Sequence, residues 1–124
     1  MNKKHITHGK LKVFMILFLA VILIVLVVVC AKKIKLSQNE KNIIGTWKNS
    51  NSENVITVQD SDTLILYKDI PEAGLYHGNA SYHFSYTDTI CVTQDDISAE
   101  FCVDIDENQL IIYFAGQVYL VLQK

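Results

Sequence analysis

Two cysteines in the C-terminal part of the chain are spaced so that they could form a disulfide. Cys91 and Cys102 lie in neighbouring segments of alternating polar and apolar residues, 89–94 and 98–105. If these segments pair across a turn centred on residues 96–97, the two thiols lie opposite each other on the outer face of a hairpin. Adjacent exposed thiols in an oxidising compartment form a disulfide, so the pattern predicts a Cys91–Cys102 bridge and a domain outside the cytoplasm. The alternative is two unrelated strand cysteines in a reducing compartment.

The histidines and acidic residues do not form a metal-binding pattern. A zinc site needs three or four converging ligands, and only His77 and His83 lie in the C-terminal part of the chain. Residues 104–108 resemble the start of a calcium-binding loop. However, Gln109 stands where that loop needs glycine, and Ala115 stands where it needs glutamate. We therefore expect no metal and no cofactor.

The charge pattern excludes other classes of function. Residues 36–124 contain four lysines and thirteen acidic residues, a net charge of −9 with histidines neutral, and the chain has no arginine. Nucleic-acid binding needs clustered positive charge, so a nucleic-acid partner is not expected. No serine–histidine–acid arrangement and no carboxylate pair can be argued from the spacing, so we expect a protein that is not an enzyme.

The longest expected connection, residues 69–78, is the candidate binding element. It carries His77, and also Leu75 and Tyr76, which have little obvious core to join. Long loops on a rigid sheet often carry binding residues. The alternative is that a strand extends through residues 75–78 with a glycine bulge.

The elements that position these residues are short strands. From residue 45 onward, apolar residues alternate with polar ones, and turn signals separate the runs. Consecutive strands joined by short turns favour an eight-stranded antiparallel up-and-down barrel, because closure removes exposed sheet edges. A two-sheet β-sandwich is the alternative. The expected strands are 45–49, 54–59, 63–68, 79–86, 89–94, 98–105, 109–114 and 117–123.

The alternation also predicts which side chains face the interior. Several are large rings, which favours an interior filled by side chains. The expected inward set is Trp47, Ile56, Val58, Leu64, Leu66, Tyr82, Phe84, Tyr86, Ile90, Val92, Phe101, Val103, Ile105, Leu110, Ile112 and Phe114.

A long apolar segment places the chain at a membrane. Residues 13–31 contain no charge, glycine or proline, and as a helix they span about 29 Å, close to the ~30 Å hydrocarbon core of a bilayer. We expect a transmembrane helix at 13–31 between a basic tail, 1–12, and a polar linker, 32–44, followed by the barrel domain, 45–124. The alternatives are a cleaved signal peptide, or a lipid anchor on Cys30.

The lysines that flank the segment favour one orientation. Lys3, Lys4, Lys10, Lys12 and the amino terminus precede it, and three lysines follow it. The excess of positive charge before the segment predicts a cytoplasmic N-terminus and an extracytoplasmic C-terminal domain.

The start of the first strand carries a resemblance. Gly45-Thr46-Trp47 followed by a β meander resembles the small lipocalin-like domains of bacterial secreted and membrane-anchored proteins. The resemblance implies that Gly45 and Trp47 form a barrel-closing motif in which the tryptophan lies across the closed end. Lipocalins usually pack an arginine on that tryptophan, and here Lys124 or Gln123 would have to take its place.

Two functions fit these observations. The first is a membrane-anchored interaction module that binds a protein partner through the 69–78 loop and the outer face of the barrel. The second is a lipocalin-like binder of a small apolar ligand, which requires an open interior.

Overall fold

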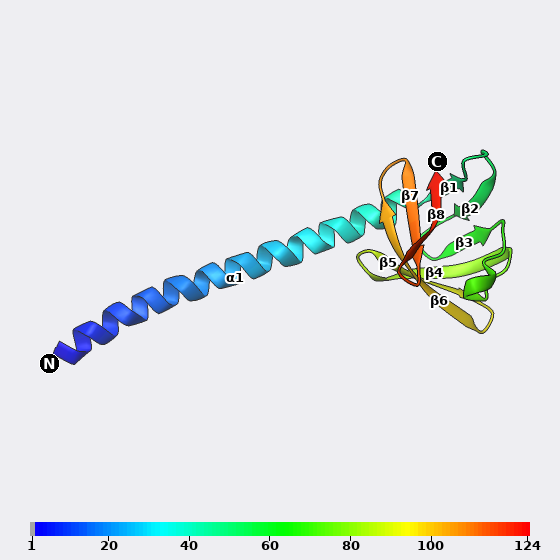
Figure 1. Ribbon diagram of the computed structural model, residues 1–124. Coiled ribbons are helices and arrows are strands. Elements are labelled where there is room, and N and C mark those ends of the chain that lie inside the picture. The colour runs from blue at the N-terminus through cyan, green and yellow to red at the C-terminus, as the bar shows by residue number, and fades with distance from the viewer. Residues whose placement is uncertain (1) are drawn as a thin grey trace. The chain divides into compact units, whose positions relative to one another are not determined.

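The computed structural model describes residues 2–124, with side chains from Gly9 onward. The chain divides into two compact units, Met1–Ile34 and Lys35–Lys124. The described residues of the first unit are helical. The second contains the end of the same helix and the β-strands (Figure 1).

Helix α1 (Asn2–Asn42) contains the apolar segment. Its long apolar side chains from Leu11 to Val29 are exposed around the whole circumference. A helix that is apolar on all sides is stable where lipid surrounds it, because its backbone groups are satisfied internally. By length and composition α1 can cross a membrane, and a signal sequence would have the same properties.

The strands form a closed, all-antiparallel up-and-down barrel, with each strand paired to the next in the chain (Figure 1). This confirms the expected fold and excludes the sandwich. The strands are β1 (Gly45–Lys48), β2 (Asn54–Val58), β3 (Thr63–Leu66), β4 (Gly78–Tyr86), β5 (Thr89–Gln94), β6 (Ile97–Ile105), β7 (Gln109–Phe114) and β8 (Gln117–Gln123). A short 3₁₀ helix, η1 (Pro71–Ala73), lies between β3 and β4.

The core follows the expected alternation with one exception. Of the expected inward residues, all but three are buried, and two of these three, Phe84 and Phe114, are half-buried against the core. The prediction for Tyr86 is wrong, because its side chain is 71% exposed. A β-bulge shifts the β4–β5 register between Phe84 and Tyr86, which reverses the alternation at the end of β4.

The register between β5 and β6 also differs from the expected one. The two-residue turn is Asp95-Asp96, with Gln94 paired to Ile97, and Asp95 adopts a left-handed conformation with φ of 53°. Aspartate tolerates this conformation better than most residues. The turn therefore lies one residue earlier than expected, and every cross-strand pair shifts by two residues.

The expected polar linker, 32–44, is helical as far as Asn42. One face of this segment packs against the barrel. On it Leu36 is half-buried, and Asn39 and Ile43 are buried. Asn39 Nδ2 donates a 2.7 Å hydrogen bond to the Thr87 carbonyl in the β4–β5 turn. The last turns of α1 are therefore part of the barrel's own packing.

Candidate functional site

The loop between β3 and β4 folds back onto the barrel. Ile70 and Leu75 form an isolated antiparallel bridge, with their backbone N–H groups donating to each other's carbonyls at 2.8 and 3.1 Å. Gly74 ends η1 in a left-handed conformation with φ of 75°, and its N–H donates to the Pro71 carbonyl. This tight turn directs both bridge side chains into the core.

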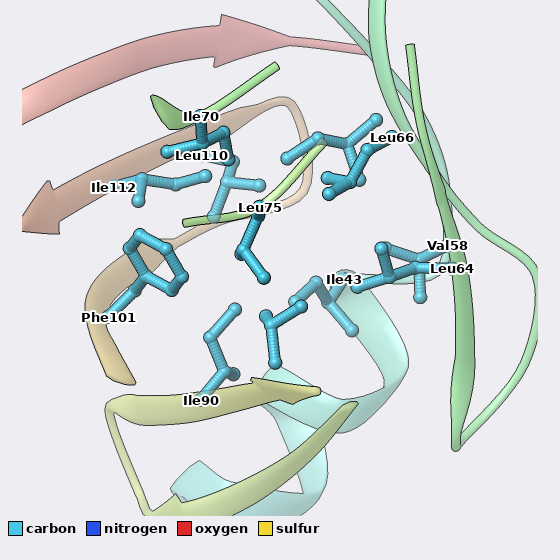
Figure 2. A pocket seen from close by; sticks show the side chains of 12 residues that line it. Ile43, Val58, Leu64, Leu66, Ile70, Leu75, Ile90, Phe101, Leu110 and Ile112 are labelled. Carbon is cyan, nitrogen blue, oxygen red and sulfur yellow. The ribbon is translucent and has the colours of Figure 1, made fainter. Parts of the chain in front are cut away.

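Leu75 therefore cannot contact a partner, which corrects its assignment as a binding residue. Its side chain is 0% exposed, and it lies among Ile43, Ile90 and Phe101 in the barrel interior (Figure 2). The physical reason is that β3 and η1 are short, so the loop crosses the mouth of the barrel and supplies side chains that the strands do not.

Tyr76 and His77 stay on the surface and are held firmly. Tyr76 is 58% exposed, and its backbone N–H and carbonyl bond to the Gln94 side-chain amide at 2.8 and 2.7 Å. The His77 backbone N–H and ring Nδ1 lie 2.8 and 2.7 Å from Asp69 Oδ1. The backbone N–H of His77, followed by its ring, holds the pKa of the Asp69 carboxyl below its usual value. The loop therefore presents Tyr76 from a fixed backbone.

The other side of the loop is tied to β8. Tyr119 donates a 2.6 Å hydrogen bond to Glu72 Oε2. This bond to the carboxylate, together with some desolvation, raises the pKa of Tyr119 to about 12. The bond brings η1 against the last strand of the barrel.

The interior of the barrel is almost filled. The remaining cavity has a volume of about 20 Å³ and is lined only by apolar side chains, twelve in all, from both ends of the barrel (Figure 2). This is room for about one water molecule, whereas ligand pockets measure roughly 300–1,000 Å³. Leu75 and Ile43 both line this cavity and occupy space that a ligand would need.

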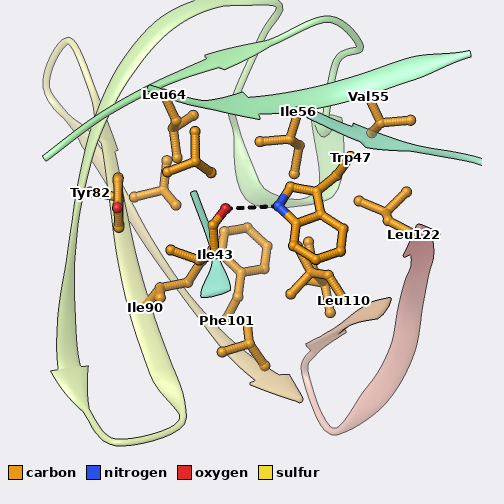
Figure 3. Packing of buried hydrophobic residues seen from close by; sticks show 14 of the residues in the cluster. Ile43, Trp47, Val55, Ile56, Leu64, Tyr82, Ile90, Phe101, Leu110 and Leu122 are labelled. Carbon is orange, nitrogen blue, oxygen red and sulfur yellow. Dashed lines mark hydrogen bonds between the residues drawn. The ribbon is translucent and has the colours of Figure 1, made fainter. Parts of the chain in front are cut away.

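The Gly45–Trp47 motif lies where α1 enters the barrel. Trp47 is fully buried, and its indole N–H donates a 2.8 Å hydrogen bond to the Ile43 carbonyl (Figure 3). Lys124 Nζ lies 5.1 Å from the centre of the Trp47 ring and donates to the Asn42 carbonyl at 3.0 Å. Gly45 has φ of 135°, and a Cβ there would lie 2.9 Å from Lys124 Cε. Glycine thus lets the lysine lie against the tryptophan.

The two cysteines are not opposite each other. Cys91 pairs with Glu100, and Cys102 pairs with Thr89, so the register on which the disulfide prediction depended is wrong. The two cysteines lie on the outer face as diagonal neighbours. In antiparallel sheets the Cα atoms of diagonal neighbours are about 7–8 Å apart, which is beyond the usual range for a disulfide. Both are free thiols in the structure, and Cys102 is exposed.

Within the part of the chain that the structure describes, no three histidine, cysteine, aspartate or glutamate side chains lie close enough together to hold a metal ion. Comparison of the chain with models of known families, with curated proteins and with solved structures found no significant match.

Sequence reasoning missed the helix residues that pack into the barrel. Asn39 was assigned to a spacer, yet it is 2% exposed. The spacing of Leu36, Asn39 and Ile43 at i, i+3 and i+7 was the available signal, because it matches one face of a helix.

Proposed function

We propose that this protein is a membrane-anchored interaction module. Its helix anchors it with the N-terminus in the cytoplasm, and its barrel binds another protein outside the cytoplasm. The observation that carries the proposal is the filled barrel, with a remaining cavity of about 20 Å³. A barrel without interior space offers only its outer surface for recognition.

The loop that carries Tyr76 is the favoured contact element on that surface. An exposed tyrosine on a rigid backbone adds contact area at little cost in conformational entropy. Tyr76 meets this description, because its backbone is bonded on both sides to Gln94. His77, bonded to Asp69, stands beside it as a second polar contact.

The orientation rests on charge. Lys3, Lys4, Lys10, Lys12 and the amino terminus precede the apolar segment, and three lysines follow it. Positive charge is retained on the cytoplasmic side during insertion. The acidic composition of residues 36–124 suits a domain that stays clear of an anionic membrane surface.

The alternative, a lipocalin-like binder of a small apolar ligand, needs an interior that the loop now fills. Leu75 and Ile70 would have to leave the core before an acyl chain could enter. The Gly45–Trp47 motif and the lysine on its ring favour a lipocalin-like closed end, but a closed end alone does not create a ligand cavity.

Site-directed photo-crosslinking tests the proposal. Benzoylphenylalanine placed at Tyr76 in the full-length protein, in membranes of cells that express it, should give an adduct of protein mass. The same group at Tyr86, which is 71% exposed at the opposite end of the barrel, is the matched control. Tyr76→Ala should then weaken binding of the captured protein about tenfold, whereas Tyr86→Ala should not.

Native mass spectrometry of the same protein, released gently from the membrane, tests the alternative of a bound apolar ligand. A stable adduct of lipid mass on the barrel, together with no protein adduct at position 76, would contradict the interaction module and support the ligand binder.

A further inference from the structure

The last strand of the barrel has an open edge. β8 pairs with β7 along its length, from Phe114↔Gln117 to Gln109↔Gln123. On the β1 side it has one pair, Lys48↔Gln123. The reason is that the chain turns away directly after Lys48, where Asn49 Oδ1 accepts hydrogen bonds from the backbone N–H groups of Asn51 and Glu53.

The backbone groups on this edge can be assigned from the ladder. The Lys124 N–H donates to the Asn108 carbonyl, so Lys124 and Leu122 direct their backbone groups towards β7. Gln123 and Val121 therefore direct theirs the other way. Gln123 meets Lys48, but among the described residues Val121 has no strand partner on that side. Its N–H and carbonyl therefore form no ladder hydrogen bond there and can pair with an incoming strand.

The surface along the edge is apolar and lacks the usual protection. The Val118 and Val121 side chains are 58% and 49% exposed. The β8 residues Gln117–Gln123 include no charge and no proline, the two features that commonly block pairing at a strand edge. The strand's own sequence therefore does not block pairing with a second chain.

A groove of about 510 Å³ continues this edge, lined by Lys48, Asn49, Ser50, Ser52, Val121, Gln123 and Lys124. Two of the four lysines of residues 36–124 lie here, and the lining includes no acidic residue. Among the described residues Lys48 forms no ion pair, in contrast to Lys68, which is bonded to Glu53 at 2.9 Å. The Lys124 ammonium is already bonded to the Asn42 carbonyl, so Lys48 is the positive charge that the groove offers to a partner on this acidic domain.

We propose that the β8 edge binds an extended, acidic segment of a partner protein as an added β-strand. Backbone hydrogen bonds to Val121 supply affinity, and an acidic side chain beside Lys48 sets the register. A second copy of this chain fits less well, because β8 has no acid to meet Lys48 and the two domains would repel each other. This inference rests on the proposed role as an interaction module, and it specifies the chemistry of the partner.

Selection from a random peptide library tests this edge. Full-length protein in lipid nanodiscs serves as bait for phage-displayed peptides. We expect enrichment of peptides that alternate β-branched residues with glutamate or aspartate. Their affinity should fall at least about tenfold for Val121→Pro, which removes the open N–H but no bond to β7. Val121→Thr, which keeps the N–H and the branched side chain, should bind like the unaltered protein.

Two lysine variants test whether the charge of Lys48 contributes to peptide binding. Lys48→Gln should weaken the selected peptides and reduce the salt dependence of their binding, because an unpaired lysine is lost. Lys68→Gln, which removes a lysine already paired with Glu53, should leave both unchanged.

A modified peptide keeps the test decisive if Val121→Pro fails to fold. Methylation of alternate backbone nitrogens in a selected peptide removes its donors and should abolish binding to the unaltered protein. Equal binding of methylated and plain peptides, equal binding by Val121→Pro, or no enrichment of acidic peptides would each overturn the proposal. If photo-crosslinking at Tyr76 still captures a protein, the interaction module stands and only the β8 site is wrong.

Discussion

At the scale of single residues, two neighbours in the loop between β3 and β4 differ completely in burial. Leu75 is fully buried, whereas Tyr76 is exposed, although both are apolar residues in a segment without strand periodicity. The Ile70–Leu75 bridge explains the difference, because it directs alternate side chains of the loop to opposite faces. Leu75 therefore stabilises the barrel core, whereas the exposed Tyr76 side chain is free to contact a partner.

This difference predicts the stability of two adjacent variants. Leu75→Ala should lower the free energy of unfolding by about 2–5 kcal/mol, since it removes a side chain from a packed core. Tyr76→Ala should change it by no more than about 0.5 kcal/mol. Urea unfolding of the full-length protein in detergent micelles, followed by near-ultraviolet circular dichroism, measures both. Equal effects of the two variants would contradict the assignment of Leu75 to the core.

At the scale of elements, the end of α1 and the barrel are one packing unit. Asn39 is buried and donates to the Thr87 carbonyl, while its Oδ1 has no hydrogen-bond partner. Trp47 binds the Ile43 carbonyl just beyond the helix. These contacts hold the last helical turns against the β4–β5 turn and the start of β1.

The Asn39 contact predicts a pH-dependent variant. Asn39→Asp should destabilise the protein by about 3–5 kcal/mol at neutral pH, because it buries an unpaired carboxylate facing the Thr87 carbonyl. Burial raises the folded-state pKa of that carboxyl above its unfolded value. The loss of stability should therefore diminish as pH falls through the raised pKa and a proton becomes available for the Thr87 carbonyl.

Urea unfolding at neutral and mildly acidic pH measures this effect. Glu40→Gln, at the neighbouring exposed position, is the control and should change stability by no more than about 0.5 kcal/mol. If the two variants behave alike, the end of the helix is not packed into the barrel.

At the scale of the whole molecule, the charges divide between the parts of the chain. Residues 1–35 carry seven lysines and no acid, and residues 36–124 carry a net charge of −9. Such a division suits a basic membrane flank on one side and an acidic domain on the other. The proposed orientation rests on the positive charge next to the apolar segment, with four lysines and the amino terminus before it and three lysines after it.

Cys102 offers a direct test of the orientation. Its thiol is exposed on the barrel, so a membrane-impermeant maleimide should label it in intact cells after mild reduction. Cys102→Ser should remove most of the signal, because Cys91 is only half-exposed and Cys30 lies in the apolar segment. Labelling that appears only after the membrane is opened would place the barrel in the cytoplasm.

The sequence by itself determined the local properties of this protein. The alternation from residue 45 onward predicted the strands, the barrel and most of the core, and the apolar run at 13–31 predicted a helix long enough to span a membrane. Both are properties of consecutive residues, because side-chain direction follows from the backbone period.

Only the tertiary structure decided the features that depend on distant contacts. A left-handed Asp95 set the β5–β6 register, and a bulge turned Tyr86 outward. Leu75 entered the core because short strands left the barrel mouth to be covered, and β8 kept an open edge because β1 turns away after Lys48. Strand offset and loop burial depend on which distant residues meet, and no local pattern in the chain specifies that.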